Sequence, residues 1–324
     1  MAKAIRINKT GGPEVLQLEE VQVGDPGPGQ ARIRHTAIGV NYLDTYQRSG
    51  LYPVQVPMGA GNEGAGVVEA VGEGVTTVKK GDRVAYTGGA AGSYAEARLY
   101  PADRLVKVPE GISDELAASI MLKGMTVWYL IHRTYAVKKG DTVLFHAAAG
   151  GVGQIAVQWL KHLGATVIAT VGSDDKAKIV QKLGADHVIV YTRENFTERV
   201  KEITGGKGLP VVYDSVGKST FDGSLDCLRP LGLMVSFGNA SGPVPPLNLG
   251  LLSAKGSLFI TRPTLVTYVA SRENLETASS ALFEVVKSGK VKIDISARSK
   301  LADAVQVHKD LEARKTTGSV VMLP

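Results

Sequence analysis

A regular alternation of short apolar runs and amphipathic stretches constrains the fold of this chain more than any other feature. The apolar runs are Thr142–His146, Thr166–Val171, His187–Val190, Val211–Asp214, Leu233–Phe237 and Ser257–Ile260. Helical periodicity fills the intervals between them, and Gly164 and Gly184 end two of the helical stretches. Apolar strands that alternate with helices are typical of βαβ units and a parallel sheet. The pattern predicts an α/β region with a doubly wound sheet over residues 124–262.

The turn after the first apolar run has the composition of a phosphate-binding loop. From Ala148 to Gly153 it reads Ala-x-Gly-x-x-Gly, and it follows a predicted strand and opens a predicted helix. Small residues let the backbone approach a pyrophosphate, and the helix N-terminus offers free N–H groups. The expected contacts are Ala149, Gly150, Gly151 and Val152. A close helix–sheet contact without a ligand would need similar residues. The loop follows the first strand of the predicted strand–helix series, however, and this position favours a dinucleotide-binding Rossmann domain.

The end of the second predicted strand indicates which dinucleotide is bound. NAD-preferring domains place an acid there, which binds the ribose hydroxyls. Here Asp174 and Asp175 come later, where acids cap a helix, and Lys176 follows them. The missing acid favours the 2′-phosphate of NADPH, although the two acids would oppose a phosphate if they faced it. The residues expected at the adenosine end are Gly172, Ser173, Lys176 and Tyr191, the last of which could equally be a packed strand residue.

Residues 1–123 follow a different rhythm. Short β-like runs lie between glycine and proline breaks, as at Ala31–Ala37, Gly66–Val71, Arg83–Tyr86 and Ser93–Leu99. Short strands at this spacing predict a small barrel or sandwich. Residues 263–324 are too few for a domain, so we expect them to pack on the first region. In this tail the pattern predicts a helix over Ser271–Ser288, strands over Val291–Ile295 and Ser319–Leu323, and between these strands a helix near Ala302–Arg314.

Composition excludes several other classes of protein. The chain has 324 residues, enough for two domains, and its single cysteine, Cys227, excludes an intrachain disulfide and any multi-cysteine metal site. No apolar run approaches the roughly 18 residues of a membrane span, and the N-terminus lacks a signal-peptide core. We therefore expect a cytoplasmic protein with no membrane partner. The net charge is +6, but the charges are interspersed, which predicts a solvated surface rather than a nucleic-acid site.

Several segments together resemble one known family. They are Gly39–Tyr46, Ser49–Pro53, Asn62–Gly64, Leu122–Thr126, Ala147–Gly153, Tyr213–Gly217 and Phe259–Pro263. Along the whole chain the sequence resembles the zinc-free, zeta-crystallin-like quinone oxidoreductases of the medium-chain dehydrogenase/reductase superfamily. The resemblance implies a GroES-like, partly open β-barrel catalytic domain from residues 1–123 and 263–324. It also implies a Rossmann NADP(H)-binding domain at 124–262, with the active site in the cleft between the two.

The zinc alcohol dehydrogenases of that superfamily differ from this chain at their metal ligands. They carry a cysteine where this chain has Asn41, and Gly-His-Glu where it has Gly61, Asn62 and Glu63. Zinc needs three or four well-placed N, S or O ligands, and the six histidines are scattered without an i, i+4 pair. We therefore expect no metal site. Without a Lewis acid, an acceptor that takes a hydride readily, such as a quinone, suits the chain better than an alcohol.

The resemblance also implies the residues of the active site. Asn41 would hydrogen-bond the nicotinamide ribose or carboxamide, and Thr126 would orient the ring. Tyr46 and Tyr52 would line the substrate pocket, with a proton-donor role if one is needed, although ordinary packing explains tyrosines equally well. The further cofactor contacts implied are Phe237, Gly238, Phe259, Thr261, Arg262 and Arg314, with Arg314 at the 2′-phosphate.

The leading hypothesis from the sequence is an NADPH-dependent quinone reductase that transfers a hydride, or single electrons, without a metal. The protein would contribute proximity, orientation and exclusion of water. One alternative is reduction of the activated C=C bond of an enone or alkenal. Another is an RNA-binding or structural, crystallin-like role, for which no RNA-recognition motif is present. The family's usual assembly implies a homodimer, with residues 235–252 as one contributor.

Overall fold

The computed structural model describes residues 1–324, which form two compact units. Unit 1 contains Met1–Met125, Tyr268–Lys287 and Ile293–Pro324, and unit 2 contains Thr126–Thr267 and Ser288–Lys292. The chain therefore changes unit after residues 125 and 267, where the resemblance places boundaries after 123 and 262. Residues 288–292 belong to unit 2, although they lie within the C-terminal tail.

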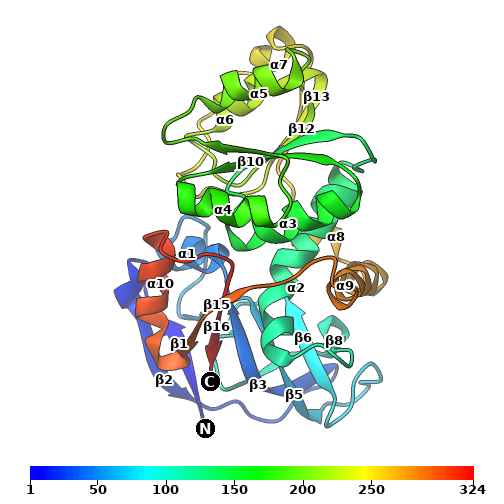
Figure 1. The fold of residues 1–324 in the computed structure, drawn as a ribbon. Coiled ribbons are helices and arrows are strands. Elements are labelled where there is room, and N and C mark those ends of the chain that lie inside the picture. The colour runs from blue at the N-terminus through cyan, green and yellow to red at the C-terminus, as the bar shows by residue number, and fades with distance from the viewer. The chain divides into compact units, whose positions relative to one another are not determined.

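Unit 2 is built on a six-stranded parallel sheet with the order β11-β10-β9-β12-β13-β14 (Figure 1). Its strands are β9 (Thr142–Phe145), β10 (Thr166–Val171), β11 (His187–Val190), β12 (Leu209–Asp214), β13 (Leu228–Ser236) and β14 (Phe259–Thr261). This order confirms the predicted doubly wound topology. The strand order reverses between β9 and β12, and dinucleotides bind at the carboxyl ends of the strands beside such a switch point.

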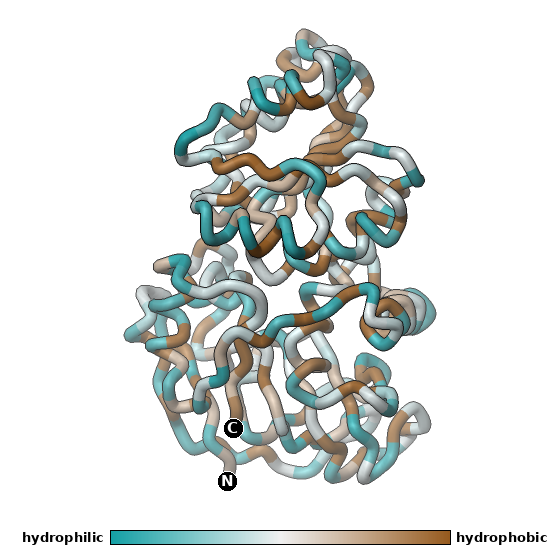
Figure 2. Tube along the Cα trace, viewed as in Figure 1, coloured by the Kyte–Doolittle hydropathy of each residue, from teal (hydrophilic) through white to brown (hydrophobic).

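Helices connect the strands of unit 2. They are α3 (Gly151–His162), α4 (Asp174–Lys182), α5 (Phe196–Thr204), α6 (Phe221–Asp226) and α7 (Gly250–Ala254). Local signals set their ends: the Asn195 side chain accepts the N–H groups of Thr197 and Glu198 at the start of α5, and Gly205 ends it at φ 57°. The central strands β9, β10 and β12 are almost wholly buried, as in a parallel sheet that helices cover, and their apolar runs are brown in Figure 2.

Unit 1 contains two sheets. One has the order β15-β16-β3-β5-β6-β8 with β7 also paired to β3, and the other is β2-β1-β4. The strands are β1 (Ala2–Ile7), β2 (Leu16–Val21), β3 (Gln30–Val40), β4 (Met58–Gly59), β5 (Glu63–Val71), β6 (Arg83–Thr87), β7 (Ala97–Pro101), β8 (Val106–Lys107), β15 (Ile295–Lys300) and β16 (Ser319–Leu323). All pairings are antiparallel except that of β15 with β16.

The longer helices outside unit 2's sheet connections are α1 (Tyr42–Ser49), α2 (Asp114–Tyr129), α9 (Arg272–Lys287) and α10 (Ala304–Glu312). The short ones are α8 (Leu265–Tyr268), three 3₁₀ turns (Pro13–Val15, Ala102–Arg104 and Leu301–Asp303) and a π-helical turn (Leu130–Thr134). The sequence patterns above predict α9 and α10 but neither α1 nor α2. No helix in the structure combines the length and apolar character needed to cross a membrane.

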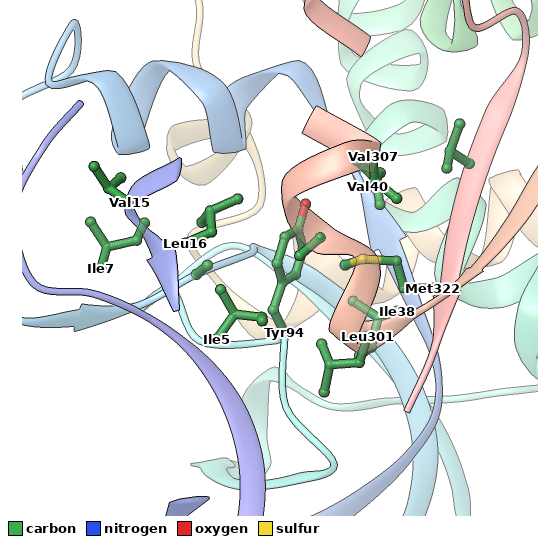
Figure 3. Packing of buried hydrophobic residues seen from close by; sticks show 13 residues of the cluster. Ile5, Ile7, Val15, Leu16, Ile38, Val40, Tyr94, Leu301, Val307 and Met322 are labelled. Atoms are coloured by element: carbon green, nitrogen blue, oxygen red, sulfur yellow. The ribbon is translucent and has the colours of Figure 1, made fainter. Parts of the chain in front are cut away.

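The main apolar cluster of unit 1 joins its N-terminal and C-terminal segments. Ile5 and Ile7 of β1 pack with Ile38 of β3, and α10 and β16 contribute Val307 and Met322. Figure 3 shows Tyr94 standing among these side chains. Residues more than 300 positions apart in the chain thus share one core, as the expectation for the tail requires.

The strand predicted over Val291–Ile295 is wrong in its position, because β15 runs from Ile295 to Lys300. The backbone at Lys292 is instead held by a side chain of α3. Gln158 accepts the Lys292 N–H at 2.9 Å and donates to the Lys292 carbonyl at 2.9 Å. The side-chain amide of Gln158 thus ties residue 292 to α3 of unit 2.

Candidate active site

The loop between β9 and α3 has the geometry of a phosphate cradle. Ala147 adopts φ 51°, and the Ala148 N–H donates to the Thr170 carbonyl at 3.1 Å, which ties the loop to β10. A Cβ atom on Gly153 would lie 2.5 Å from both the Cα and the carbonyl oxygen of Ala148. Only glycine fits there, so the first turn of α3 lies directly against the loop. The N-terminus of α3 then presents backbone N–H groups and a partial positive charge to an anion.

A buried polar network at the start of this loop joins it to the neighbouring strand and helix. The sequence patterns above do not predict this network. His146 binds Thr170 through Nδ1 at 2.8 Å and Ser224 through Nε2 at 3.0 Å. Ser224 donates its proton to Asp214 at 2.9 Å, so it accepts from Nε2–H, and Thr170 donates to Nδ1. Burial lowers the pKa of His146, which keeps the ring neutral in this tautomer. The only signal in the sequence is polar residues at the ends of three apolar strands.

Asp214 connects the same network to the next loop. Its Oδ1 accepts the N–H groups of Val216 and Gly217 at 2.7 and 3.1 Å, and its Oδ2 accepts the Thr220 hydroxyl at 2.7 Å. Gly217 has φ 90°, a conformation that favours glycine. The carboxyl ends of β9, β10 and β12 are thus joined by side-chain hydrogen bonds at the switch point of the sheet.

The carboxyl end of β10 carries no acid. Ser173 follows Gly172 there and caps α4, where its hydroxyl accepts the Lys176 N–H at 3.4 Å. The acids that would oppose a phosphate are bound to cations of their own. Asp174 pairs with Arg193 at 2.5 Å, and Asp175 pairs with Lys178 at 3.0 Å. Local negative charge is therefore neutralised on this side of the sheet.

Tyr191 lies beside this position. A Cβ atom on Gly172 would come within 2.7 Å of the Tyr191 hydroxyl, so the missing side chain of Gly172 makes room for the ring. Tyr191 is 39% exposed, whereas Lys176 is half-buried. The structure thus brings Gly172, Ser173, Lys176 and Tyr191 together. A hydroxyl, an amine and an aromatic ring without an adjacent free acid fit a 2′-phosphorylated adenosine.

The carboxyl ends of β13 and β14 border a pocket of about 420 Å³, which Ser236, Asn239, Thr261 and Arg262 line with other residues. Arg262 donates to the Ser236 hydroxyl at 3.2 Å and to the Gly238 carbonyl at 2.9 Å. With its amide oriented to satisfy both of its ends, Asn239 accepts from the same guanidinium at 3.2 Å. Arg262 therefore braces the loop that follows β13.

The neighbouring Phe237 and Gly238 occupy the start of that loop. The ring of Phe237 lies 5.8 Å from that of Phe145 at the end of β9. A Cβ atom on Gly238 would lie 2.4 Å from the Ser215 carbonyl, so a larger residue would displace the loop. Phe259 is separated from these residues, because it begins β14 rather than ending it and is 59% exposed.

In unit 1 the structure brings Asn41, Tyr46 and Tyr52 together around α1. Asn41 directly precedes the helix, and the Tyr52 N–H donates to the Tyr46 carbonyl at 3.1 Å. The rings of Tyr46 and Tyr52 are 5.1 Å apart, and Tyr42 adds an edge-on contact to Tyr46 at 5.4 Å. Three tyrosines thus form one aromatic surface, with Asn41 at the start of the helix that carries two of them.

Two further predicted residues lie elsewhere. Thr126 is buried in α2, at the first residue of unit 2. Arg314 follows α10 rather than lying in it, with a left-handed φ of 57°. Burial raises the pKa of Tyr42 and the guanidinium of Arg314 opposes that rise, which indicates that Arg314 lies near α1.

Buried charges surround the start of α1. Asp44 accepts the Asn41 N–H at 2.8 Å, the Asn62 amide at 2.7 Å and the Tyr94 hydroxyl at 2.8 Å. Glu63 is fully buried, and burial raises the pKa of both carboxyls against these hydrogen bonds. The sequence patterns above predict a site role for neither acid. Their only signal was their place within segments that carry the family resemblance.

The fold and these two sets of residues define a medium-chain dehydrogenase/reductase. The model of the alcohol dehydrogenase GroES-like domain matches residues 27–110, and that of the zinc-binding dehydrogenase domain matches residues 151–283. Both domains are therefore present, and the chain belongs to the quinone oxidoreductase family of this superfamily.

The relatives agree over the full length. A quinone oxidoreductase of Pseudomonas aeruginosa is 53% identical over 325 residues, with 100% of each chain covered. The crystal structure of Escherichia coli quinone oxidoreductase complexed with NADPH has a TM-score of 0.98 at 50% identity and 100% coverage of both chains. A 2-haloacrylate reductase of a Burkholderia species is 50% identical over 331 residues, covering 100% of this chain and 99% of the relative.

The zinc in the name of one matched domain is not supported by the side chains here. No group of three or more His, Cys, Asp or Glu residues lies close enough to hold a metal ion. At the position that corresponds to the metal ligands, the Glu63 oxygens accept from the Leu122 N–H at 2.7 Å and the Asn41 amide at 2.7 Å. The ammonium group of Lys123 lies 3.7 Å from the carboxylate. An amide and an ammonium group beside Glu63 do not fit a zinc site.

Proposed function

We propose that this chain is an NADPH-dependent quinone reductase. The observation that carries the proposal is the anion cradle at α3 combined with an adenosine end whose two nearby acids are each paired with a cation. Relatives at 50% identity or more are named quinone oxidoreductases, and one of them binds NADPH in its crystal structure. When bound, NADPH supplies the reducing equivalents for the reaction.

The residues of unit 2 are assigned to the cofactor. The loop residues Ala149, Gly150, Gly151 and Val152 would bind its pyrophosphate. Gly172, Ser173, Lys176, Tyr191 and Arg314 are assigned to the adenosine and its 2′-phosphate. Phe237, Gly238, Thr261, Arg262 and Thr126 are assigned to the nicotinamide half, with Asn41 from unit 1. Phe259 is the weakest member of the set, because of its exposed place at the start of β14.

The residues of unit 1 are assigned to the substrate. The ring of Tyr52, half-buried against the buried Tyr46, offers an aromatic face against which a planar quinone can stack. The hydroxyls of both tyrosines are the candidate proton donors to the reduced quinone oxygen. Acid–base chemistry contributes little else, so orientation of the two reactants and exclusion of water account for most of the acceleration.

The test measures oxidation of NADPH and of NADH, each with and without a simple para-quinone. We expect quinone-dependent oxidation that strongly prefers NADPH. The variant Lys176→Glu should raise the KM for NADPH by at least about tenfold and leave the KM for NADH within about twofold, because the 2′-phosphate loses a cation and gains an anion. Lys182→Glu, an exposed charge reversal on the same helix, is the matched control. Equal use of both cofactors by the unmodified protein would contradict the assignment.

Reduction of an activated C=C bond is the second candidate function. The observation that favours it is the 50% identity to a 2-haloacrylate reductase over the full chain. Turnover of a simple quinone and of 2-chloroacrylate at equal NADPH separates the two. Faster turnover of the acrylate would make this the main activity, with the cofactor assignment unchanged.

A homodimer and a cytoplasmic location complete the proposal. The edge strand β14 and the nearby chain expose large apolar side chains, of which Phe259, Leu231 and Leu249 are 59, 66 and 73% exposed. An open strand edge with apolar neighbours favours pairing with a second copy. Sedimentation of the purified protein should give the dimer mass, and Phe259→Asp should shift it towards the monomer.

A further inference from the structure

We propose that Glu63 and Lys123 are positioning residues of the reaction, whose buried ion pair holds the Asn41 side-chain amide in a single orientation. In that orientation Asn41 presents its carbonyl oxygen, and not its NH₂ group, to its ligand. The inference rests on the proposed function, because it takes Asn41 as a contact of the cofactor. It adds two residues that touch neither reactant and states which chemical group Asn41 recognises.

The orientation of the amide follows from what faces it. The Asn41 Nδ2 donates to Glu63 Oε2 at 2.7 Å, and Asn41 is only 3% exposed. An ionised carboxylate can only accept hydrogen bonds, so the opposite end of the amide would be repelled. The other carboxylate oxygen accepts the Leu122 N–H at 2.7 Å, which holds the carboxyl group itself in place.

Both Glu63 oxygens accept N–H groups, as those of a carboxylate do, and the positive charge of Lys123 opposes the rise that burial causes in the Glu63 pKa. The Lys123 ammonium group lies 3.7 Å from Glu63 Oε2 and donates to the Val40 carbonyl at 3.0 Å. Both side chains are buried, with 8% of the Lys123 side chain and none of the Glu63 side chain exposed. A carboxylate buried without a partner loses its charge, because desolvation favours the neutral acid. A neutral acid could donate to the amide oxygen, and Asn41 could then turn over.

The peptide unit before Asn41 is held at both ends by charged groups. Asp44 accepts the Asn41 N–H at 2.8 Å, and Lys123 binds the carbonyl of the preceding residue. The Asn41 side chain also takes part in a capping box with Asp44, in which its oxygen faces the Asp44 backbone N–H. The amide oxygen and the amide nitrogen are thus each turned toward a fixed group, which leaves one orientation of the side chain.

The recognised group must therefore be a donor. A carbonyl oxygen accepts from a hydroxyl or an amide NH₂, both of which occur on the nicotinamide riboside half of NADPH. It would repel a carbonyl or carboxylate oxygen at the same place. Asn41 would then discriminate by hydrogen-bond polarity, and Glu63 would set that polarity.

If the ion pair had only a structural role, removing one member would destabilise the protein, as it does wherever a buried pair lies, and the effect would not depend on Asn41. The test is therefore a double-mutant cycle between Glu63→Gln and Asn41→Ala, read in NADPH affinity by fluorescence and in kcat/KM with a quinone. We expect each single variant to lose about 10- to 100-fold, a size typical of outer-shell changes. The double variant should lose no more than Asn41→Ala alone, because without the amide nothing remains for Glu63 to orient.

Two conservative variants sharpen the outcome. Lys123→Arg keeps the positive charge and should recover most of the activity lost in Lys123→Met. Lys123→Met alone leaves an unpaired buried charge. If that variant does not fold, the double variant Lys123→Met/Glu63→Gln, which leaves no such charge, takes its place in the measurements. Glu69→Gln is the matched control, since Glu69 lies on the same strand in a salt bridge with Arg32 and is partly exposed. It should change neither readout by more than about twofold.

Losses that multiply in the double variant, or a Glu63→Gln variant with unchanged NADPH affinity, would overturn the inference. A folded protein that binds NADPH without turning over quinone would instead contradict the proposed function. The two failures are distinguishable because the cycle is read in binding as well as in turnover.

Discussion

The two units bury polar groups in different ways. In unit 2 the strands are apolar, and the polar side chains gather at their carboxyl ends, where His146 and Asp214 join three strands. In unit 1 charged groups lie inside the fold itself. Arg48 is 2% exposed and bound at 2.5 Å to the partly exposed Glu312, and Glu63 and Lys123 form a pair in which both side chains are buried.

This difference shows how each unit makes its part of the site. The cradle of unit 2 is backbone, so small residues in the right order are sufficient to form it. The site of unit 1 is made of side chains that distant segments hold in place. Loss of the cradle glycine Gly153 should therefore impair cofactor binding most, whereas loss of a buried charge should impair the stability of unit 1 most.

The largest effect is expected from Gly153→Val, which tests the cradle. The added atoms would overlap Ala148, where even a Cβ would lie 2.5 Å from the backbone, so α3 or the loop must move. We expect NADPH affinity to fall by at least about 1,000-fold, or roughly 4 kcal/mol. Isothermal titration measures it. Gly250→Ala in α7 is the control, since its Cβ would meet only the Asn248 side chain, and near-normal binding by Gly153→Val would contradict the cradle.

The next largest effect is expected from Arg48→Met, which removes a buried guanidinium in unit 1. Arg48 donates to the Gly11 carbonyl and to His308 Nδ1, each at 3.1 Å, so two acceptors lose their partner, whereas the Glu312 side chain is 35% exposed and can be solvated. We expect a loss of about 2 to 3 kcal/mol in the free energy of unfolding, measured by circular dichroism in urea. Arg298→Met removes an exposed pair with Glu115 and should cost less than about 1 kcal/mol. If Arg48→Met and Arg298→Met lost equal free energies of unfolding, the proposed importance of buried charge in unit 1 would be contradicted.

Acidification should destabilise unit 1 through its buried histidines. Burial lowers the pKa of His308 to about 3 and that of His35 to about 4, from a usual 6.5. Between pH 6.5 and the lowered pKa of each histidine, the unfolded chain binds a proton that the folded chain does not. The free energy of unfolding therefore falls as the pH falls below 6.5. Each histidine should account for about 2 kcal/mol between pH 7 and pH 5.

The measurement can follow the units separately, because both tryptophans, Trp128 and Trp159, belong to unit 2. Because burial also lowers the pKa of His132 and His146 in unit 2, we expect the tryptophan fluorescence to change over the same range of pH as the circular dichroism. His162→Gln, at an exposed position in unit 2, is the control and should leave the profile unchanged. A profile that is flat from pH 7 to pH 5 would contradict the assignment of these histidines as buried and neutral.

The smallest effect is expected from Gln158→Met, which tests the link between α3 and residue 292. The change keeps the volume of the side chain but leaves the Lys292 N–H and carbonyl without their partner. We expect a loss of about 1 to 2 kcal/mol, seen in tryptophan fluorescence because Gln158 belongs to unit 2. Gln306→Met, on the exposed face of α10, should change the midpoint little.

Much of unit 2 was predictable from the sequence. The predicted run Thr166–Val171 is β10, His187–Val190 is β11, and the glycine-rich loop lies at the start of α3. Such features depend on neighbours in the chain, since periodicity and small residues act locally. The misplaced strand at Val291–Ile295 shows the limit, because the Gln158 side chain that holds Lys292 lies 134 residues away.

The sequence by itself therefore determined the doubly wound sheet, the phosphate cradle and, through its resemblance, the superfamily. Only the tertiary structure decided that Asp174 and Asp175 pair with Arg193 and Lys178, and that Glu63 faces Asn41 and Lys123. The physical reason is that a cradle of backbone N–H groups needs only local conformation. The charge and orientation of a side chain depend on which distant groups surround it once water is excluded.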